Sequence, residues 1–333
     1  MRSSPHTTET KRSLQVNNLI RLLGRRLVAL PIMAFGVTFL VFFLMSFSKY
    51  DPAVAALGEN ATAESLAAYR HEMGFDRPWI QQFFSYIGGL FRGDLGVYGV
   101  TRTPVADRIA DAFPITMQVT FFGLAIAVIL ATIFGVTAAL YRDQWPDQVI
   151  RVFSIIAIAT PSFWLGVLLI FVMQIKLGLL PGSGPLPAIT EDPAGWFERI
   201  LMPGFALGLP VAGQLTRIIR TSMVEELDKD YVRTAIGAGV PKREVITRNV
   251  LRNALITPVT VLGMKIGYLI GGAIIIEVIF GLPGMGTVMF DGINGNEPIL
   301  VQGVVLVVAL SFIIINIIVD LLYVLINPRI RTV

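Results

Sequence analysis

Three ionisable residues, Lys265, Glu277 and Asp320, lie inside long apolar stretches, where an isolated charge is costly. Pro258 and Asn327 mark the ends of two of these stretches. Lys265 follows Pro258 by seven residues and Asp320 precedes Asn327 by seven, so at about 1.5 Å per residue each charge lies about 10 Å from the end of its stretch. Their equal depth and opposite charge predict an ion pair between two membrane helices. Alternatively, Lys265 extends to the membrane surface and Asp320 faces a neighbouring subunit. Glu277 and Asp320 are also the carboxylates that could bind the coupling ion in a proton- or sodium-coupled transporter.

A second charged segment, Asp228–Pro258, separates two apolar stretches and carries six basic residues. An apolar stripe at helical spacing marks its first half, and another amphipathic stretch follows Pro241. Gly239 can adopt the left-handed conformation that ends a helix, and Pro241 suits the first turn of the next. We therefore predict two short helices joined by a tight turn. The stripe consists of Tyr231, Val232, Ala235 and Ile236, with Asp230, Arg233 and Thr234 off it.

The composition of this loop allows two interpretations. A pair of amphipathic helices can rest on anionic lipid head groups. The same pair can instead present a short, ordered helix to a partner protein. Residue types alone do not distinguish the two.

Prolines and polar side chains at mid-membrane depth form a third group. A proline in a membrane helix frees a backbone carbonyl, which must then face protein or a wet cavity. Pro161 with Ser162, and Pro210 with Gln214, are therefore candidates for lining a translocation path. Helix packing is the alternative explanation of the same residues.

Most other chemistry is excluded by the residue types. The chain has no Cys, which excludes disulfides, thiol nucleophiles and Cys-ligated metals, and its two histidines, His6 and His71, lie in polar segments. It has no Gly-Lys dipeptide and hence no phosphate-binding Walker loop, and the glycines of Gly237–Gly239 follow no predicted strand. We therefore predict no catalytic residue, no metal site and no bound cofactor, so that energy for transport comes from an ion gradient or another protein.

The elements that position these residues are predicted to be membrane helices. Of the 333 residues 54% are hydrophobic and only 15% charged, against about a quarter charged in soluble domains. A spanning helix needs about 20 apolar residues, and six stretches are predicted to span, the fourth weakly because prolines and polar residues interrupt it. These are Leu27–Phe47, Ile115–Leu140, Val149–Ile175, Ile200–Met223, Val259–Phe280 and Leu300–Ile326.

The distribution of Lys and Arg predicts the orientation of these helices. Eighteen of the 27 basic residues fall in the leader, the tail and two loops on one side, which the positive-inside rule makes cytoplasmic. The net charge of +4 therefore reports topology and gives no reason to expect nucleic acid. The prediction is an all-α protein with six membrane helices and both termini cytoplasmic. It consists of a leader (1–26) and a transmembrane domain (27–333) that includes an external cap (48–114).

Several motifs, in this order and spacing, resemble those of one transporter family. They are GFDRPW, RGDLG, PITMQVT, TPSFW, DYVRTAIGAG, VLRNALITP, EVIFGLPGMG, VQGVVLV, NIIVDLLY and NPRIR. Together they resemble the permease subunits of binding-protein-dependent ABC importers, in the dipeptide, oligopeptide and nickel branch. The resemblance spans nearly the whole chain. Only Ala235 and Gly239 match the general EAA---G pattern of that family's loop, and KYDPA stands where the branch usually has GDP.

The resemblance implies a type I importer fold and a role for the charged loop. Loop 224–258 would be the coupling loop that sits in a groove on a cytoplasmic ATPase. Small side chains at Ala235 and Ala238 would permit close approach, and Asp230 and Arg233 would make charge-assisted contacts at the rim. The implied coupling residues are Asp230, Tyr231, Arg233, Thr234, Ala235, Ala238, Gly239, Arg252 and Asn253.

The resemblance also implies partners and a place in the cell. A second, homologous permease would complete the path in a bacterial inner membrane, two ATPase subunits would bind ATP and Mg²⁺, and an external binding protein would deliver cargo. The expected substrate is a di- or oligopeptide, with nickel chelates or another small solute as alternatives. Two other classes stay open: an ion-coupled transporter using Glu277 and Asp320, and a membrane scaffold or receptor, which would need neither the ordered loop nor the proline kinks.

Overall fold

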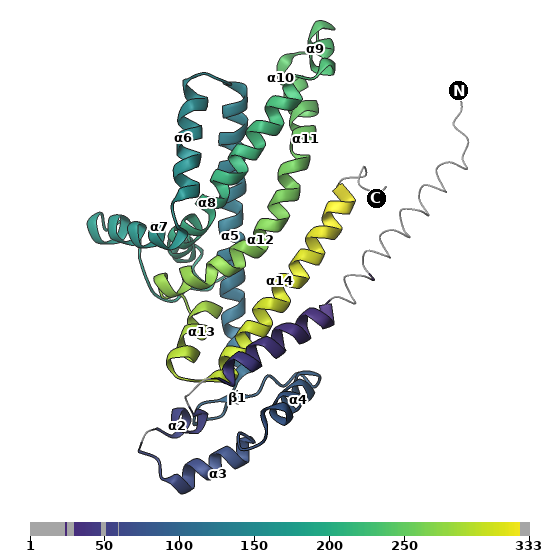
Figure 1. The fold of residues 1–333 in the computed structure, drawn as a ribbon. Helices are drawn as coiled ribbons and strands as arrows, with labels where there is room; N and C mark the ends of the chain where they lie inside the picture. Colours follow the sequence, from purple (N-terminus) through teal and green to yellow (C-terminus); the bar gives the residue numbers. More distant parts are fainter. Residues whose placement is uncertain (1–23, 25–29, 48–50, 59, 327–333) are drawn as a thin grey trace.

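The computed structural model describes residue 24 and residues 30–47, 51–58 and 60–326. Long helices form a bundle with a small cap at one end and the charged loop at the other (Figure 1). We call these two ends the cap end and the loop end. The long bundle helices are α5 (Val105–Leu140), α6 (Trp145–Ala159), α8 (Pro193–Leu227), α12 (Ile256–Phe280) and α14 (Pro298–Ile326).

Within the described part of the chain, three helices are each long and apolar enough to cross a membrane. They are α5, α12 and α14, the last as far as Val319. A fourth candidate is a bent pair of helices, and the described part of the first predicted span contains the apolar helix Leu30–Met45. The all-α membrane architecture is thus confirmed.

The third predicted span, Val149–Ile175, is not one continuous helix. The chain bends by 100° between α6 and the segment made of α7 (Ser162–Leu169) and its π-helical continuation η1 (Ile170–Lys176). Thr160 is extended, with φ −81° and ψ 118°. The ring of Pro161 clashes with helical backbone at the preceding residue, and Pro161 has no N–H to continue the helix. A proline expected to kink the span therefore breaks it.

Helix α8, the weakest predicted span, is the centre of the bundle. It runs unbroken for 35 residues through Pro203 and Pro210. It packs along α5 and also contacts α6, α7 and α12. Neighbouring helices bury most of its middle, which explains why its sequence is less apolar than that of a lipid-facing helix.

Small residues let α5 and α8 approach closely. On α8, Gly204 and Gly208 form a G-x-x-x-G pattern. A Cβ on Gly208 would overlap the backbone carbonyl of Gly123 on α5, and one on Gly135 of α5 would lie 2.7 Å from the Ile219 side chain. The facing residues of α5 recur every four positions, namely Gly123, Ala127, Ala131, Gly135 and Ala139, and all five are buried. Such small residues are typical of membrane helix interfaces.

The cap is built from short helices and one hairpin. They are α2 (Pro52–Leu57), α3 (Ala63–Met73), α4 (Trp79–Leu90), and the antiparallel pair β1 (Val97–Tyr98) and β2 (Thr103–Pro104). Asp51 accepts a hydrogen bond from Arg70 Nε at 2.9 Å, and this contact lowers the pKa of the carboxyl. Phe83 of α4 contacts Phe39 and Phe42 of the helix Leu30–Met45, with ring centroids 5.5 and 5.4 Å apart. Aromatic packing thus joins the cap to the first apolar helix.

Candidate functional site: the charged loop and its attachment

The charged loop projects from the loop end of the bundle (Figure 1). It contains α9 (Asp230–Gly237), α10 (Lys242–Glu244), a π-helical turn η2 (Val245–Val250) and α11 (Leu251–Ala254). The predicted pair of short helices is therefore confirmed, although the second helix is irregular.

Gly239 ends α9 as predicted, with a φ of +87°. The Val240 N–H donates to the Ala235 carbonyl at 3.1 Å, and the Gly239 N–H donates to the Ile236 carbonyl at 3.0 Å. These two bonds form a Schellman motif, which requires the left-handed residue that glycine supplies. The turn between the helices is thus defined by hydrogen bonds.

Helix α9 has an inner and an outer face. Val232 is buried on the inner face, and Tyr231 and Ala235 pack beside it against the bundle core. Burial raises the pKa of the Tyr231 hydroxyl. Ile236 of the predicted stripe is 42% exposed, so the outer face carries an apolar side chain without a partner in the described chain.

The remaining predicted coupling residues are mostly on the outer face. Arg233 and Asp230 are exposed and 3.9 Å apart, and Thr234 Oγ1 donates to the Asp230 carbonyl at 3.0 Å. Arg233, Thr234, Ala238, Gly239 and Arg252 are all exposed. Ala235 and Ala238 therefore lie in different environments, and only Ala238 is freely accessible.

A buried carboxylate that the sequence analysis missed attaches the loop to the bundle. Glu226, in the last turn of α8, has only 6% of its surface exposed. Its carboxylate accepts from Tyr231 Oη at 2.9 Å, from Asn253 Nδ2 at 3.1 Å and from Lys229 Nζ at 2.5 Å. Two predicted coupling residues, Tyr231 and Asn253, thus meet on one side chain. An acidic residue within an otherwise apolar helical stripe was the available signal.

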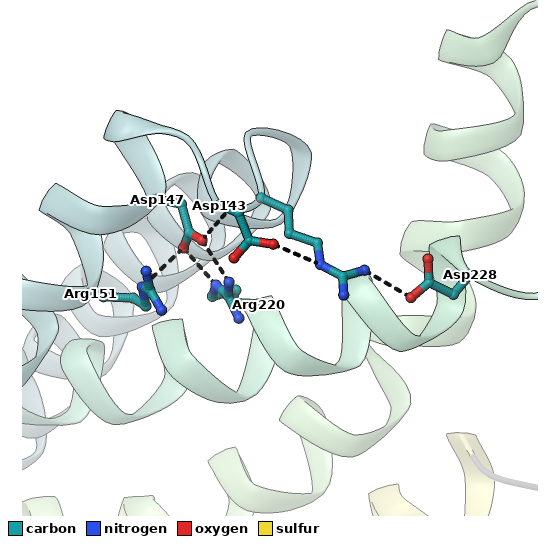
Figure 2. A network of polar contacts seen from close by, with 6 residues as sticks. Asp143, Asp147, Arg151, Arg220 and Asp228 are labelled. Atoms are coloured by element: carbon teal, nitrogen blue, oxygen red, sulfur yellow. Dashed lines mark hydrogen bonds and ion pairs between the residues drawn. The ribbon is translucent and has the colours of Figure 1, made fainter.

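A second missed cluster joins the α5–α6 turn to α8 (Figure 2). The fully buried Asp147 of α6 accepts two hydrogen bonds from Arg220 of α8, each 2.6 Å long. It also accepts from the Asp143 N–H at 2.9 Å, with Arg151 at 3.8 Å. A neighbouring pair extends this network: Arg142 contacts Asp143 at 3.4 Å and, at 2.9 Å, Asp228 at the C-terminal end of α8.

The three predicted intramembrane charges have different outcomes. The Lys265 ammonium lies 5.6 Å from the centre of the Tyr268 ring. The side chain of Asp320 is outside the described residues, so the predicted Lys265–Asp320 pair stays a prediction. Glu277 is fully buried and accepts from the Gly286 N–H of α13 (Met285–Asn294) at 2.6 Å.

Glu277 therefore holds the short helix α13 against the bundle. The neighbouring N–H, that of Met285, donates to Thr116 Oγ1 of α5 at 2.9 Å. Side chains from α12 and α5 thus satisfy two of the free N–H groups at the start of α13. This contact gives Glu277 a structural role, as a helix cap supplied by another helix.

The four candidate path residues lie in two different settings. Pro210 is buried inside the bundle and Gln214 is half-buried one turn along α8. Pro161 is exposed at the bend and Ser162 is half-buried beside it. The two pairs stay predictions for the translocation path.

Comparison with known proteins identifies the family. Residues 131–332 match the family described as the inner membrane component of binding-protein-dependent transport systems, and residues 19–120 match its N-terminal part. A putative peptide transport system permease protein of Brucella abortus (strain 2308) is 36% identical over 93% of this chain and 98% of its own. The glutathione transport system permease protein GsiC of Escherichia coli (strain K12) is 37% identical over 92% of this chain and 97% of its own.

A solved structure supports the fold independently. An inward-facing structure of the MetNI methionine ABC transporter matches with a TM-score of 0.50 and 14% identity, over 66% of this chain and 96% of that one. The family match confirms the resemblance carried by the sequence motifs. The chain belongs to the family of binding-protein-dependent transport system inner membrane components, the multi-pass permease subunits of ABC importers.

Proposed function

We propose that this chain is one permease subunit of an importer for peptides. The observation that carries the proposal is the ordered loop whose outer face has no partner in the described chain, in a protein whose relatives are named for peptide and glutathione transport. The chain pairs with a second, homologous permease as a heterodimer. Two cytoplasmic ATPase subunits, which bind ATP and Mg²⁺, and an external substrate-binding protein complete the complex. Nickel chelates or another small solute are the alternative cargo.

The proposed topology has six crossings with both termini in the cytoplasm. In it, α6 with α7 and η1 form the third crossing as a bent one, and α8 forms the fourth. The leader is 1–26, the transmembrane domain is 27–333 and the external cap is 48–114. The distribution of Lys and Arg along the sequence supports this orientation, since the segments assigned to the cytoplasmic side carry 18 of the 27 basic residues.

In this proposal the outer face of α9 enters a groove on the ATPase, within the coupling loop 224–258. Ile236 supplies an apolar anchor, Ala238 lets the helix approach closely, and Asp230 and Arg233 make contacts at the rim of the groove. The inner face of α9 packs on the bundle. Movement of the ATPase subunits during ATP binding is thereby passed to the membrane helices.

The ion-coupled alternative has less support. It needs Glu277 as an ion carrier, but one carboxylate oxygen of Glu277 accepts the Gly286 N–H and Glu277 packs against α13. This contact gives the Glu277 carboxylate a role in holding α13, which needs no bound ion.

Ile236→Glu and Gly237→Leu are expected to detach the ATPase subunits while the permease stays folded. Ile236 is 42% exposed, and a Cβ on Gly237 would meet no atom within 4 Å, so neither change disturbs the permease itself. A charge or a bulky group at an interface hot spot costs about 2 kcal/mol or more of binding energy, roughly 30-fold in affinity. Co-purification from native membranes, with quantification of each bound chain, measures this loss.

The matched control is Val100→Glu, which places the same charge on an exposed apolar residue at the cap end. That variant should retain the ATPase subunits in full. Normal ATPase recovery with both loop variants would contradict the docking proposal. Peptide uptake driven by an ion gradient alone, without ATPase subunits, would favour the secondary-transporter class.

A further inference from the structure

The carboxylate of Glu226 connects three elements at the loop end. It belongs to the last turn of α8, while its partners Tyr231 and Asn253 lie on α9 and α11. Lys229, in the link between α8 and α9, supplies a third donor at 2.5 Å. The Glu226 side chain is almost fully buried, whereas Lys229 and Asn253 reach it from exposed positions, and hydrogen bonds to a charged acceptor are strong and directional.

Helix α9 has few other attachments. It has eight residues, and only Val232 is buried, with Tyr231 and Ala235 packed beside it. Its connection to α8 passes through Asp228 and the extended residue Lys229, where φ is −72° and ψ is 146°. An extended link of this kind acts as a hinge, so without further contacts α9 could tilt while α8 stayed in place.

Asn253 extends the connection to another membrane helix. It lies on α11, which leads through Leu255 directly into α12. Glu226 therefore lies on α8, is hydrogen-bonded to α9, and is joined through Asn253 and the next few residues to α12, which also packs on α8. A displacement of α9 is therefore passed through this carboxylate to α8 and α12 together.

We propose that Glu226 is the positioning residue that makes α9 move with α8 and α12, so that ATPase motion is converted into opening and closing of the path. The inference rests on the proposed docking of α9 to an ATPase. It differs from that docking in its site, because Glu226 faces inward and makes no contact with the ATPase. Loss of Glu226 would leave docking intact and let α9 pivot at Lys229. The result is an uncoupled importer that hydrolyses ATP without moving cargo.

The test uses the complete importer in lipid nanodiscs and proteoliposomes, with its binding protein and a peptide substrate. Glu226→Ala is expected to keep the ATPase subunits bound and the basal hydrolysis within about twofold of wild type. The number of peptides moved per ATP should fall by about tenfold, the scale of a typical coupling between two sites. Glu226→Gln keeps one acceptor oxygen and should be intermediate.

Two milder variants cover the case in which Glu226→Ala fails to assemble. Tyr231→Phe and Asn253→Ala each remove one donor and leave the carboxylate in place, and each is expected to lower the transport-to-hydrolysis ratio by roughly two- to tenfold. In the double variant the two losses should be non-additive, because both donors act through one carboxylate. Arg248→Ala, which breaks the exposed 2.6 Å pair with Glu244 in the same loop, is the matched control and should leave the ratio unchanged.

Each outcome separates the inference from the proposed function. Coupled transport at the wild-type ratio in Glu226→Ala, or in both donor variants if that protein does not assemble, overturns the role of Glu226 and leaves ATPase docking standing. A wild-type protein that binds no ATPase overturns the proposed function itself. Loss of ATPase binding in both donor variants would also overturn the inference, because Glu226 would then serve docking and not force transfer.

Discussion

Arg220→Met is expected to destabilise the folded chain by about 3–5 kcal/mol, the usual cost of leaving one member of a buried ion pair without its partner. Asp147 is fully buried and receives both guanidinium hydrogen bonds at 2.6 Å (Figure 2). After the substitution it retains the Asp143 N–H and the more distant Arg151. Those two contacts do not neutralise the carboxylate at short range. The midpoint of SDS-induced unfolding in mixed micelles measures the loss.

Two further variants test the cause of this effect. Arg142→Met breaks a neighbouring exposed pair, with Asp228 at 2.9 Å, and should cost less than about 1 kcal/mol. The double variant Asp147→Leu, Arg220→Met removes both charges and should recover much of the stability lost in Arg220→Met. Equal losses in Arg220→Met and Arg142→Met would contradict the prediction.

The buried pair also bears on transport. Asp147 lies in the first turn of α6, and Arg220 lies six residues before Glu226 on α8. The pair therefore holds the start of α6 to the same stretch of α8 that carries the attachment of α9. In the proposed mechanism, α6 and α8 move together at the loop end because this clamp joins them.

Features with a local cause could be predicted from the sequence. The apolar stretches correspond to α5, α12 and α14, and the Gly239–Pro241 pair does separate two short helices. Properties of the local sequence decide such features. A spanning helix follows from the length and hydrophobicity of its stretch, and the helix end at Gly239 follows from the left-handed backbone that glycine adopts easily.

Features with a tertiary cause could not be predicted from the sequence. Pro161 breaks its helix while Pro203 and Pro210 do not, because α8 is enclosed by neighbours that stabilise its backbone. The Glu226 and Asp147 clusters unite residues from several elements, and their contacts with Asn253 and Arg220 join positions 27 and 73 residues apart. The Gly204–Gly208 pattern was visible in the sequence, but its partner surface on α5 becomes defined only in the packed bundle.

Gly208→Leu is expected to destabilise the bundle by about 3 kcal/mol or more, at the upper end of the usual cost of overpacking. A Cβ at this position would already overlap the backbone carbonyl of Gly123, and a backbone atom cannot move aside as the end of a side chain can. The four side-chain carbons of leucine would force α5 and α8 apart along their shared face. The same unfolding measurement, together with the yield of monodisperse protein, reports the effect.

Gly271→Leu in α12 is the matched control, because a Cβ there would meet no atom within 4 Å. An equally large loss in this variant would mean that glycine at such positions serves backbone flexibility and not close packing. Gly208→Ala separates the two explanations further: it improves helix propensity by about 1 kcal/mol but adds the overlapping Cβ. Net destabilisation by alanine at 208, with a neutral or stabilising effect of alanine at 271, would place the close approach of α5 and α8 among the main determinants of the fold. The close packing on α5 also holds α8, the helix that carries Arg220 and Glu226, in a fixed position in the bundle.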